Sequence, residues 1–97
     1  MVRALQAEGF GVLEAGSGSE ALRLLEPPTP AIDLLITDVY LPDTDGAELA
    51  SRVRRSFPRP PVLFISGKVG ELDSENYLAK PFSMTKLVAR VRALLRV

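Results

Sequence analysis

The chain has 97 residues, 46% of them hydrophobic, and its 12 basic and 12 acidic side chains give no net charge. This length supports one domain with a modest core, and the charge balance gives no electrostatic reason to expect nucleic acid or an anionic membrane as a direct ligand. The chain contains neither cysteine nor histidine, which excludes disulfides, the usual zinc sites and acid–base catalysis by histidine.

Hydropathy along the chain predicts neither a membrane span nor a secretory leader. No segment approaches the roughly 18 consecutive apolar residues of a transmembrane helix. The first residues, which include Arg3 and Glu8, lack the basic and then apolar pattern of a signal peptide. We therefore expect a cytoplasmic protein.

The first elements predicted along the chain are a short helix and a short strand. Val2 and Leu5 fit one helical face, and Gly9 follows as a stop signal. Gly11 to Ala15 is then a strand candidate, because Val12 lies in a short apolar stretch between glycines.

A second helix is predicted to begin after Ser17. Ser17 and Glu20 have the spacing of a capping box, in which the hydroxyl accepts a hydrogen bond from the third backbone amide. Apolar residues continue the helical pattern to Leu25, and the two prolines that start at Pro27 end it.

The run from Ile32 to Asp38 is the most informative part of the sequence. It is rich in Leu and Ile and stops on a carboxylate, which is typical of a buried, parallel strand. In an open α/β sheet, ligands bind at the carboxyl ends of the strands, so Asp38 is placed where a reactive carboxylate would lie. Pro42 and Gly46 follow and indicate a turn.

Two more strands end on polar groups. A helical pattern from Leu49 to Phe57 stops at Pro58, and Pro61 to Ser66 is then an apolar run that ends on a hydroxyl. A strand over Asn76 to Ala79 leads directly to Lys80. We expect these groups to lie at the same edge of the sheet as Asp38, because parallel strands end together.

The connection between these two strands is short, and the last helix is the clearest in the chain. Only Gly67 to Glu75 remain for a crossover that usually needs a dozen or more residues, so we predict no helix longer than about two turns there. The last helix covers Met84 to Leu95, with Ser83 as its N-cap and Phe82 placed to form a hydrophobic staple with Leu87.

Carboxylate, hydroxyl and ammonium, in this order at three strand ends, resemble the receiver domain of two-component response regulators. The resemblance runs over essentially the whole chain and implies a single α/β domain over residues 1–97. Its fold would be flavodoxin-like (CheY-like), a three-layer sandwich around a parallel sheet of order 2-1-3-4-5. The sequence starts within the first helix of that pattern, so we expect an N-terminally truncated receiver whose first strand position is vacant.

The resemblance also implies a role for each polar group. Asp38 matches the phospho-accepting aspartate, Lys80 the lysine that pairs with it, and Ser66 the switch hydroxyl that binds a phosphoryl oxygen. Gly67 leaves room for the phosphoryl group, and Tyr77 matches the aromatic switch residue that rotates behind Ser66.

Further positions match the surroundings of this site in the family. Pro42 and Gly46 match the turn after the acceptor, and Pro81 stands where the family usually has a cis proline. Tyr40 and Lys68, each two residues beyond a site residue, would flank the phosphoryl group and govern the access of hydrolytic water.

The family holds magnesium with the acceptor aspartate and an acidic pair at the end of the first strand. This sequence retains only Asp38 of that set, so we predict weak magnesium binding at most. The implied partners are a histidine kinase or phosphotransfer protein, and an output domain or a second copy. The alternative is a degenerate, phosphorylation-independent interaction module that uses the last helix.

Simpler interpretations exist for the same residues. Taken alone, Asp38 is a common turn former, Lys80 a solvated side chain, Pro81 a helix-start signal, Tyr77 a core residue and Tyr40 an exposed loop residue. The segment Asp43 to Gly46 looks like the motif of haloacid-dehalogenase-type phosphatases, but Asp43 does not directly end a strand. It also fails as an EF-hand loop, because Leu41 and Arg52 would occupy ligand positions.

Overall fold

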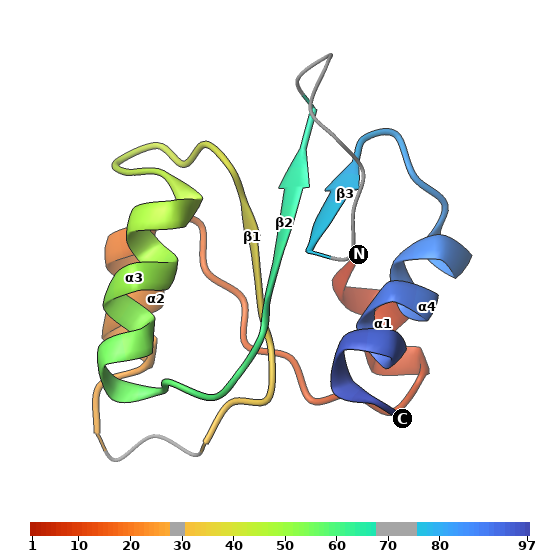
Figure 1. Cartoon of the computed structure of the whole chain (residues 1–97), viewed down its shortest axis with the longest axis horizontal. Helices are drawn as coiled ribbons and strands as arrows, with labels where there is room; N and C mark the ends of the chain where they lie inside the picture. Colours follow the sequence, from red (N-terminus) through yellow and green to blue (C-terminus); the bar gives the residue numbers. More distant parts are fainter. Residues whose placement is uncertain (28–30, 68–75) are drawn as a thin grey trace.

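The computed structural model of this chain describes residues 1–27, 31–67 and 76–97. The described elements, in chain order, are helices α1 (Val2–Ala7) and α2 (Gly18–Leu24), strand β1 (Leu35–Asp38), helix α3 (Gly46–Ser56), strands β2 (Val62–Ser66) and β3 (Tyr77–Ala79), and helix α4 (Met84–Leu95) (Figure 1). The prediction for the crossover Gly67 to Glu75 falls, beyond Gly67, outside the described residues.

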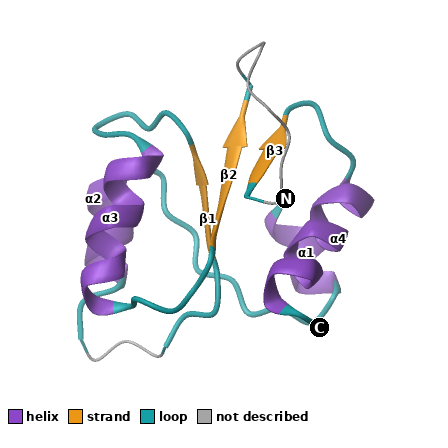
Figure 2. Cartoon of the chain, viewed as in Figure 1, coloured by secondary structure: helices purple, strands orange, loops and turns teal. Residues whose placement is uncertain are grey.

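A parallel sheet with strand order β1-β2-β3 forms the middle layer. Leu35 lies opposite Val62 and Asp38 opposite Ile65, while Ser66 lies opposite Ala79. Helices α2 and α3 lie on one side of the sheet, and α1 and α4 lie on the other (Figures 1 and 2). This is the predicted three-layer α/β arrangement with all described strands parallel, so their polar carboxyl ends share one edge.

Helices α2 and α4 begin where the sequence predicts capping residues. Ser17 Oγ accepts a hydrogen bond from the Glu20 amide, as the predicted capping box requires, and Ser83 Oγ accepts one from the Lys86 amide at the start of α4. Each satisfies one of the amides that a helix leaves unpaired in its first turn. No helix in the described part of the chain has the length and apolar character needed to cross a bilayer.

The main core lies between the sheet and the α1/α4 layer. Leu63, Leu78 and Leu87 have no exposed surface, and Leu5 and Val91 join them in one buried cluster. Phe82, predicted to form the hydrophobic staple, packs against this cluster. Burying a Leu side chain contributes about 2 kcal/mol, so this layer carries much of the hydrophobic stabilisation.

Helix α1 is held against α4 by contacts between the two ends of the sequence. Glu8, which follows α1, forms an ion pair of 2.8 Å with Arg92 of α4. The Arg92 guanidinium also lies over the Phe10 ring, 5.6 Å from its centroid. Gly9 links the two with a φ of +93°, a backbone conformation that favours glycine.

The strand predicted over Gly11 to Ala15 is absent, so that prediction is wrong. These residues are described, but they pair with no strand of the sheet. In the predicted strand order, this segment would pair only with a strand in the vacant first position. A strand exists only where a neighbour completes its hydrogen-bond ladder, and the apolar pattern around Val12 alone does not supply one.

The remaining differences are small and concern where elements begin and end. Strand β1 begins at Leu35 rather than Ile32, and α2 ends at Leu24, just before the predicted end at Leu25. Strand β3 begins at Tyr77, one residue after the predicted start. Shifts of one to three residues at element ends do not alter which side chains lie at the strand ends.

Candidate functional site

Asp38 and Lys80 meet at the carboxyl edge of the sheet. Lys80 Nζ lies 3.1 Å from Asp38 Oδ1, and each side chain is about half exposed, at 50% and 48%. Asp38 ends β1 and Lys80 follows β3, and the order β1-β2-β3 places β2 between them. The predicted convergence of the carboxylate and the ammonium is therefore confirmed.

Ser66 occupies the strand end between these two residues. It is the last residue of β2 and only 4% exposed. Its carbonyl accepts a hydrogen bond of 2.7 Å from the Lys80 amide, so the backbone of β2 fixes where Lys80 emerges from the sheet. A Cβ at Gly67 would lie 3.7 Å from Lys80 Cδ, an ordinary contact beside the charged pair.

The chain reverses in a tight turn directly after Asp38. Tyr40 and Asp45 form an antiparallel bridge, and the Leu41 amide donates to the Thr44 carbonyl with Pro42 between them. This agrees with the predicted turn around Pro42. Tyr40 is 63% exposed, so its ring extends to the surface beside the end of β1.

Gly46 closes this turn against the backbone of β1. Its amide donates to the Val39 carbonyl at 2.7 Å. A Cβ on Gly46 would lie 2.3 Å from the backbone oxygen of Asp38 and 3.1 Å from Thr37 Cγ2. Because real Cβ atoms do not approach a backbone oxygen so closely, only glycine fits here, and α3 can begin directly beside Asp38.

Asp43 makes a structural contact that the sequence interpretation missed. Its carboxylate accepts hydrogen bonds from the backbone amides of Gly18 at 2.9 Å and Ser19 at 3.0 Å, the first residues of α2. The bond from the Gly18 amide is the main cause of a lowered Asp43 pKa, and the bond from Ser19 adds to it. The Asp43 carboxylate therefore ties the turn after Asp38 to α2.

We predict that Asp43→Asn lowers the free energy of unfolding at neutral pH and much less in acid. The folded-state pKa of Asp43 is lowered, so its carboxylate stabilises the fold above the unfolded pKa, and this contribution is lost as pH falls through the folded pKa. Urea titrations at neutral pH and at about pH 2.5 measure the difference.

Glu14→Gln, at an exposed carboxylate of the segment before α2, is the matched control for the loss of one negative charge. It should change stability little at either pH. If Asp43→Asn destabilises the chain equally at both pH values, the charge of Asp43 is irrelevant to its contact with the start of α2.

Tyr77 lies on the surface. It is 37% exposed, and its ring stacks on Phe64 of the neighbouring strand, with 5.0 Å between centroids. The Tyr77 carbonyl accepts a hydrogen bond of 2.9 Å from Arg90 of α4, so this residue links the sheet to the last helix. The Lys80–Pro81 peptide bond is cis, as the resemblance implied. Lys68 lies outside the described residues.

Magnesium does not fit the acidic groups at this site. Within residues 1–27, 31–67 and 76–97, no three carboxylate side chains gather where a metal ion could be held. Asp38 is paired with the Lys80 ammonium, and the Asp43 carboxylate is engaged by two backbone amides. A hard cation that prefers several oxygen ligands in octahedral geometry would find one partly neutralised carboxylate.

The Asp38–Lys80 pair contributes little to stability. Exposed ion pairs are typically worth about 0 to 1 kcal/mol, and both partners are half in solvent. The same exposure leaves the Asp38 carboxylate accessible to a reacting group.

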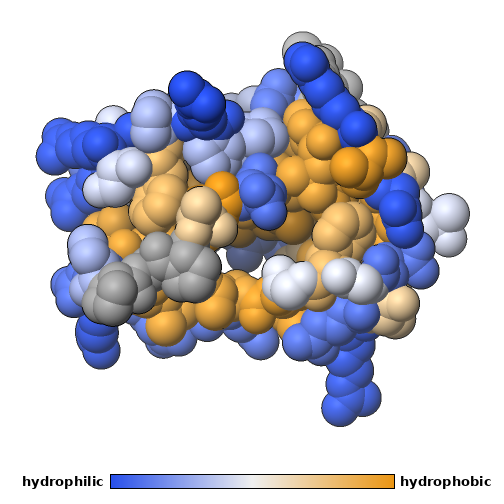
Figure 3. Space-filling model, turned by 90° about the horizontal axis from the view of Figure 1, so that it is seen from below, coloured by the Kyte–Doolittle hydropathy of each residue, from blue (hydrophilic) through white to orange (hydrophobic). Residues whose placement is uncertain are grey.

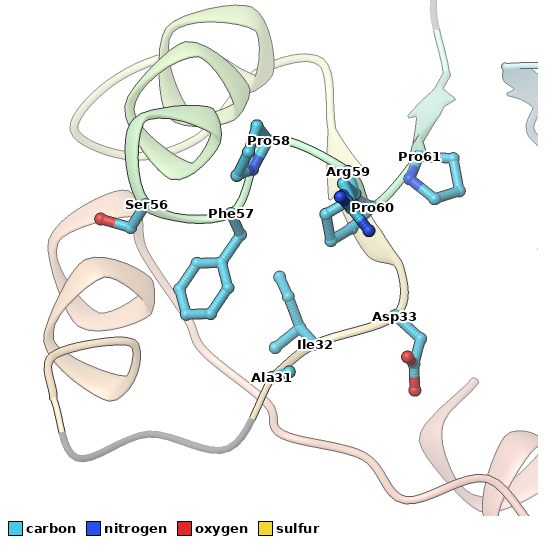
Figure 4. Close-up of a pocket in the computed structure, with 9 residues that line it drawn as sticks. All are labelled: Ala31, Ile32, Asp33, Ser56, Phe57, Pro58, Arg59, Pro60 and Pro61. Atoms are coloured by element: carbon cyan, nitrogen blue, oxygen red, sulfur yellow. The ribbon is translucent and has the colours of Figure 1, made fainter.

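A pocket lies at the opposite end of the sheet from this pair. Its volume is about 400 Å³, and its lining residues precede β1 and β2 in the chain: Ala31, Ile32, Asp33, Ser56, Phe57, Pro58, Arg59, Pro60 and Pro61. The side chains of Phe57 and Ile32 face one another across it (Figure 4). It has no part in the chemistry of Asp38, which lies at the carboxyl end of β1.

Comparison with known proteins identifies relatives of this chain. The model of the response regulator receiver domain matches residues 1–92. The transcriptional regulatory protein TrcR of Mycobacterium tuberculosis is 40% identical over 96% of this chain, and the sensor kinase CckA of Brucella abortus is 35% identical over 97% of it. The chain spans 38% of the length of TrcR and 11% of that of CckA.

Solved structures agree with this comparison. The receiver domain of a hybrid histidine kinase CckA superposes with a TM-score of 0.84 at 40% identity, covering 97% of this chain and 84% of the solved one. A response regulator from Chloroflexus aurantiacus gives a TM-score of 0.82 at 34% identity, covering 99% and 85%.

Proposed function

The chain belongs to the response regulator receiver domain family and is a receiver domain of the two-component type; from this premise we propose that Asp38 accepts the phosphoryl group. The observation that carries the proposal is the 3.1 Å approach of Lys80 Nζ to Asp38 Oδ1 at the carboxyl edge of a parallel sheet. A carboxylate beside a fixed ammonium at this edge is an arrangement suited to phosphoryl transfer, in which positioning and charge neutralisation do most of the work.

In the proposed reaction, an Asp38 carboxylate oxygen attacks the phosphorus of a phosphohistidine on a partner protein. An oxygen–phosphorus bond forms and the phosphorus–nitrogen bond breaks. The imidazole, protonated on its other ring nitrogen before the transfer, leaves as the neutral ring. Lys80 then pairs with a phosphoryl oxygen, and the Ser66 hydroxyl donates a hydrogen bond to another. Gly67 lacks a side chain and leaves space beside the new group.

The switch would connect this site to the surface of β3 and α4. Ser66 is buried and Tyr77 is partly exposed, so movement of the hydroxyl toward a phosphoryl oxygen would leave space behind it for the Tyr77 ring. Tyr77 already contacts α4 through the bond from Arg90. An output domain or a second copy of the chain would bind the changed surface. The phosphoryl donor would be a histidine kinase or a phosphotransfer protein.

Tyr40 would control the lifetime of the acyl phosphate. Tyr40 lies two residues after Asp38, and its backbone is held by the bridge with Asp45. Its ring is largely exposed. From this position the ring could shield the phosphoryl group from hydrolytic water. Lys68, by the resemblance, would flank the group from the other side.

A second candidate function is a phosphorylation-independent interaction module. The observation that favours it is the lack, among the described side chains, of a carboxylate cluster that fits magnesium. In that case the surface of α4 would bind a partner regardless of the state of Asp38.

The test uses the chain extended upstream of Met1 by an apolar strand that ends in two acidic residues. With acetyl phosphate and magnesium, intact-mass spectrometry should show one phosphate adduct, which Asp38→Asn abolishes and Lys80→Met reduces. Asp33→Asn, at the far end of the sheet, is the matched control and should keep the adduct. An adduct that persists in Asp38→Asn would refute the proposal, whereas no adduct in any extended chain would favour the interaction module.

A further inference from the structure

The pocket at the end of the sheet opposite Asp38 is built from two loops. One loop, residues 31–33, leads into β1, and the other, residues 56–61, joins α3 to β2. Figure 3 views the molecule from below, which is the end where β1 and β2 begin in Figure 1, and shows hydrophobic side chains open on this face with hydrophilic ones projecting around them. The pocket volume of about 400 Å³ lies within the range of sites that hold small molecules.

Hydrogen bonds hold both loops of this pocket in place. The Phe57 amide donates to the Val53 carbonyl at 2.8 Å, so the Phe57 backbone is fixed at the end of α3. The Leu35 amide donates to the Pro61 carbonyl at 3.1 Å and ties the first loop to the second. Prolines at positions 58, 60 and 61 further restrict the backbone of the second loop. The pocket is therefore formed before a ligand arrives, which lowers the entropic cost of binding.

The middle of the pocket is an apolar slot. The side chains of Phe57 and Ile32, both partly buried, lie on its two sides and face one another (Figure 4). An aromatic ring stacks favourably on a second ring in an offset arrangement, so a ligand ring could lie on Phe57 with Ile32 covering its other face. Burying a strongly hydrated group here would cost free energy, because apolar side chains offer it no hydrogen bonds. The slot therefore suits a flat, apolar body.

Arg59 adds a positive charge beside the slot. It is exposed and lines the pocket, and its side chain forms no ion pair within the part of the chain that the structure describes. Asp33 also lines the pocket, but its carboxylate is turned away from Phe57 and Ile32 (Figure 4). A guanidinium binds a carboxylate through two parallel hydrogen bonds. Arg59 is therefore suited to hold a carboxylate group of a ligand whose apolar part enters the slot.

We propose that this pocket binds a small aromatic carboxylate, with its ring between Phe57 and Ile32 and its carboxylate on Arg59. The facing apolar side chains account for the ring, and the unpaired guanidinium accounts for the anionic group. The site lies at the opposite end of the sheet from the Asp38–Lys80 pair. Binding therefore does not depend on phosphorylation, and it gives the domain a ligand-binding activity separate from phosphoryl transfer.

The experiment titrates the isotope-labelled chain of residues 1–97 with phenylacetate and follows its backbone amide signals by NMR. The amides of Ile32, Phe57 and Arg59 should shift and saturate with a dissociation constant on the order of 1 mM, as expected for a ligand of this size. The amides of Asp38 and Lys80 should not shift. Phenylacetamide, which keeps the shape but lacks the charge, should bind about fivefold more weakly. Acetate, which lacks the ring, should cause no saturating shift.

Variants of the chain sharpen the test. Arg59→Gln, at an exposed position, should weaken phenylacetate binding about fivefold. Arg55→Gln is the matched control, because it removes a positive charge from the last turn of α3 but does not line the pocket, and it should change binding little. Phe57→Leu keeps an apolar side chain without a ring and should weaken binding by about threefold. Asp38→Asn should bind the probe as the parent chain does, which separates this test from that of the proposed phosphoryl transfer.

Three results would overturn the proposal. The first is a titration that does not saturate by about 10 mM phenylacetate, which would mean weak, non-specific contact. The second is equal binding of phenylacetate and phenylacetamide, or unchanged binding in Arg59→Gln, since the guanidinium would then have no part in recognition. The third is a set of shifts centred on Lys80, which would place the anion on the ammonium at the other end of the sheet.

Discussion

Residues 1–97, incubated with magnesium and either acetyl phosphate or phosphoramidate, are expected to show no phosphate adduct. Metal and ammonium charges stabilise the transition state of phosphoryl transfer, and a bound metal supplies several kcal/mol of this stabilisation. A loss of about 4 kcal/mol slows a reaction roughly a thousandfold. The described residues hold one carboxylate at the site, Asp38, already paired with Lys80, so magnesium binding should be negligible at millimolar concentration.

Intact-mass spectrometry decides this prediction, with the chain extended by a strand and an acidic pair as the positive control. The extended chain should gain the adduct under the same conditions, and Asp38→Asn should remove it again. A phosphate adduct on the 97-residue chain that disappears in Asp38→Asn would show that the acidic pair is dispensable. Asp38 would then remain the acceptor, but the argument from charge would be wrong.

Gly46→Ala is expected to be the most destabilising single substitution near the site, with a loss of about 3 kcal/mol in the free energy of unfolding. The new Cβ would lie 2.3 Å from the Asp38 backbone oxygen, and a backbone atom within a strand cannot move aside as a flexible side chain can. Thermal unfolding should show a midpoint lower by roughly 10 to 20 °C for a domain of this size.

Gly11→Ala is the matched control, because a Cβ there would meet nothing within 4 Å. This variant should be as stable as the parent chain or slightly more so, since alanine restricts the unfolded chain. Equal melting midpoints for Gly46→Ala and Gly11→Ala would contradict the argument from the close approach of Gly46 to β1.

The position of the site could be predicted from the sequence because it follows from a general property of parallel sheets. Each apolar run ends on or just before one polar residue, and parallel strands end at one edge of a sheet. If the three runs form one parallel sheet, Asp38 and Lys80 must therefore lie at the same edge. Their approach is confirmed by the ion pair. The roles of Ser66, Tyr77 and Tyr40 stay predictions, because their positions alone do not test what they do.

Other features could not be predicted, because they depend on partners distant in the sequence. Gly11 to Ala15 has a strand pattern, but whether it forms a strand depends on a neighbour that local pattern does not reveal. Asp43 looked like one of several turn residues, and its bonds to Gly18 and Ser19 join positions 25 and 24 residues apart. Asp43 lies two residues before Asp45, the N-cap of α3, and nothing in this local pattern indicates a bond to the start of α2.

The contact between the two ends of the sequence sets the order in which this protein can fold on the ribosome. Glu8 and Arg92 are 84 residues apart, and α1 has only six residues, too few for a helix to persist alone in water. Its apolar face can be buried only after α4 has been synthesised. Helix α1 is thus among the last elements of this domain to become stable, and the nascent chain exposes Leu5 until α4 has emerged.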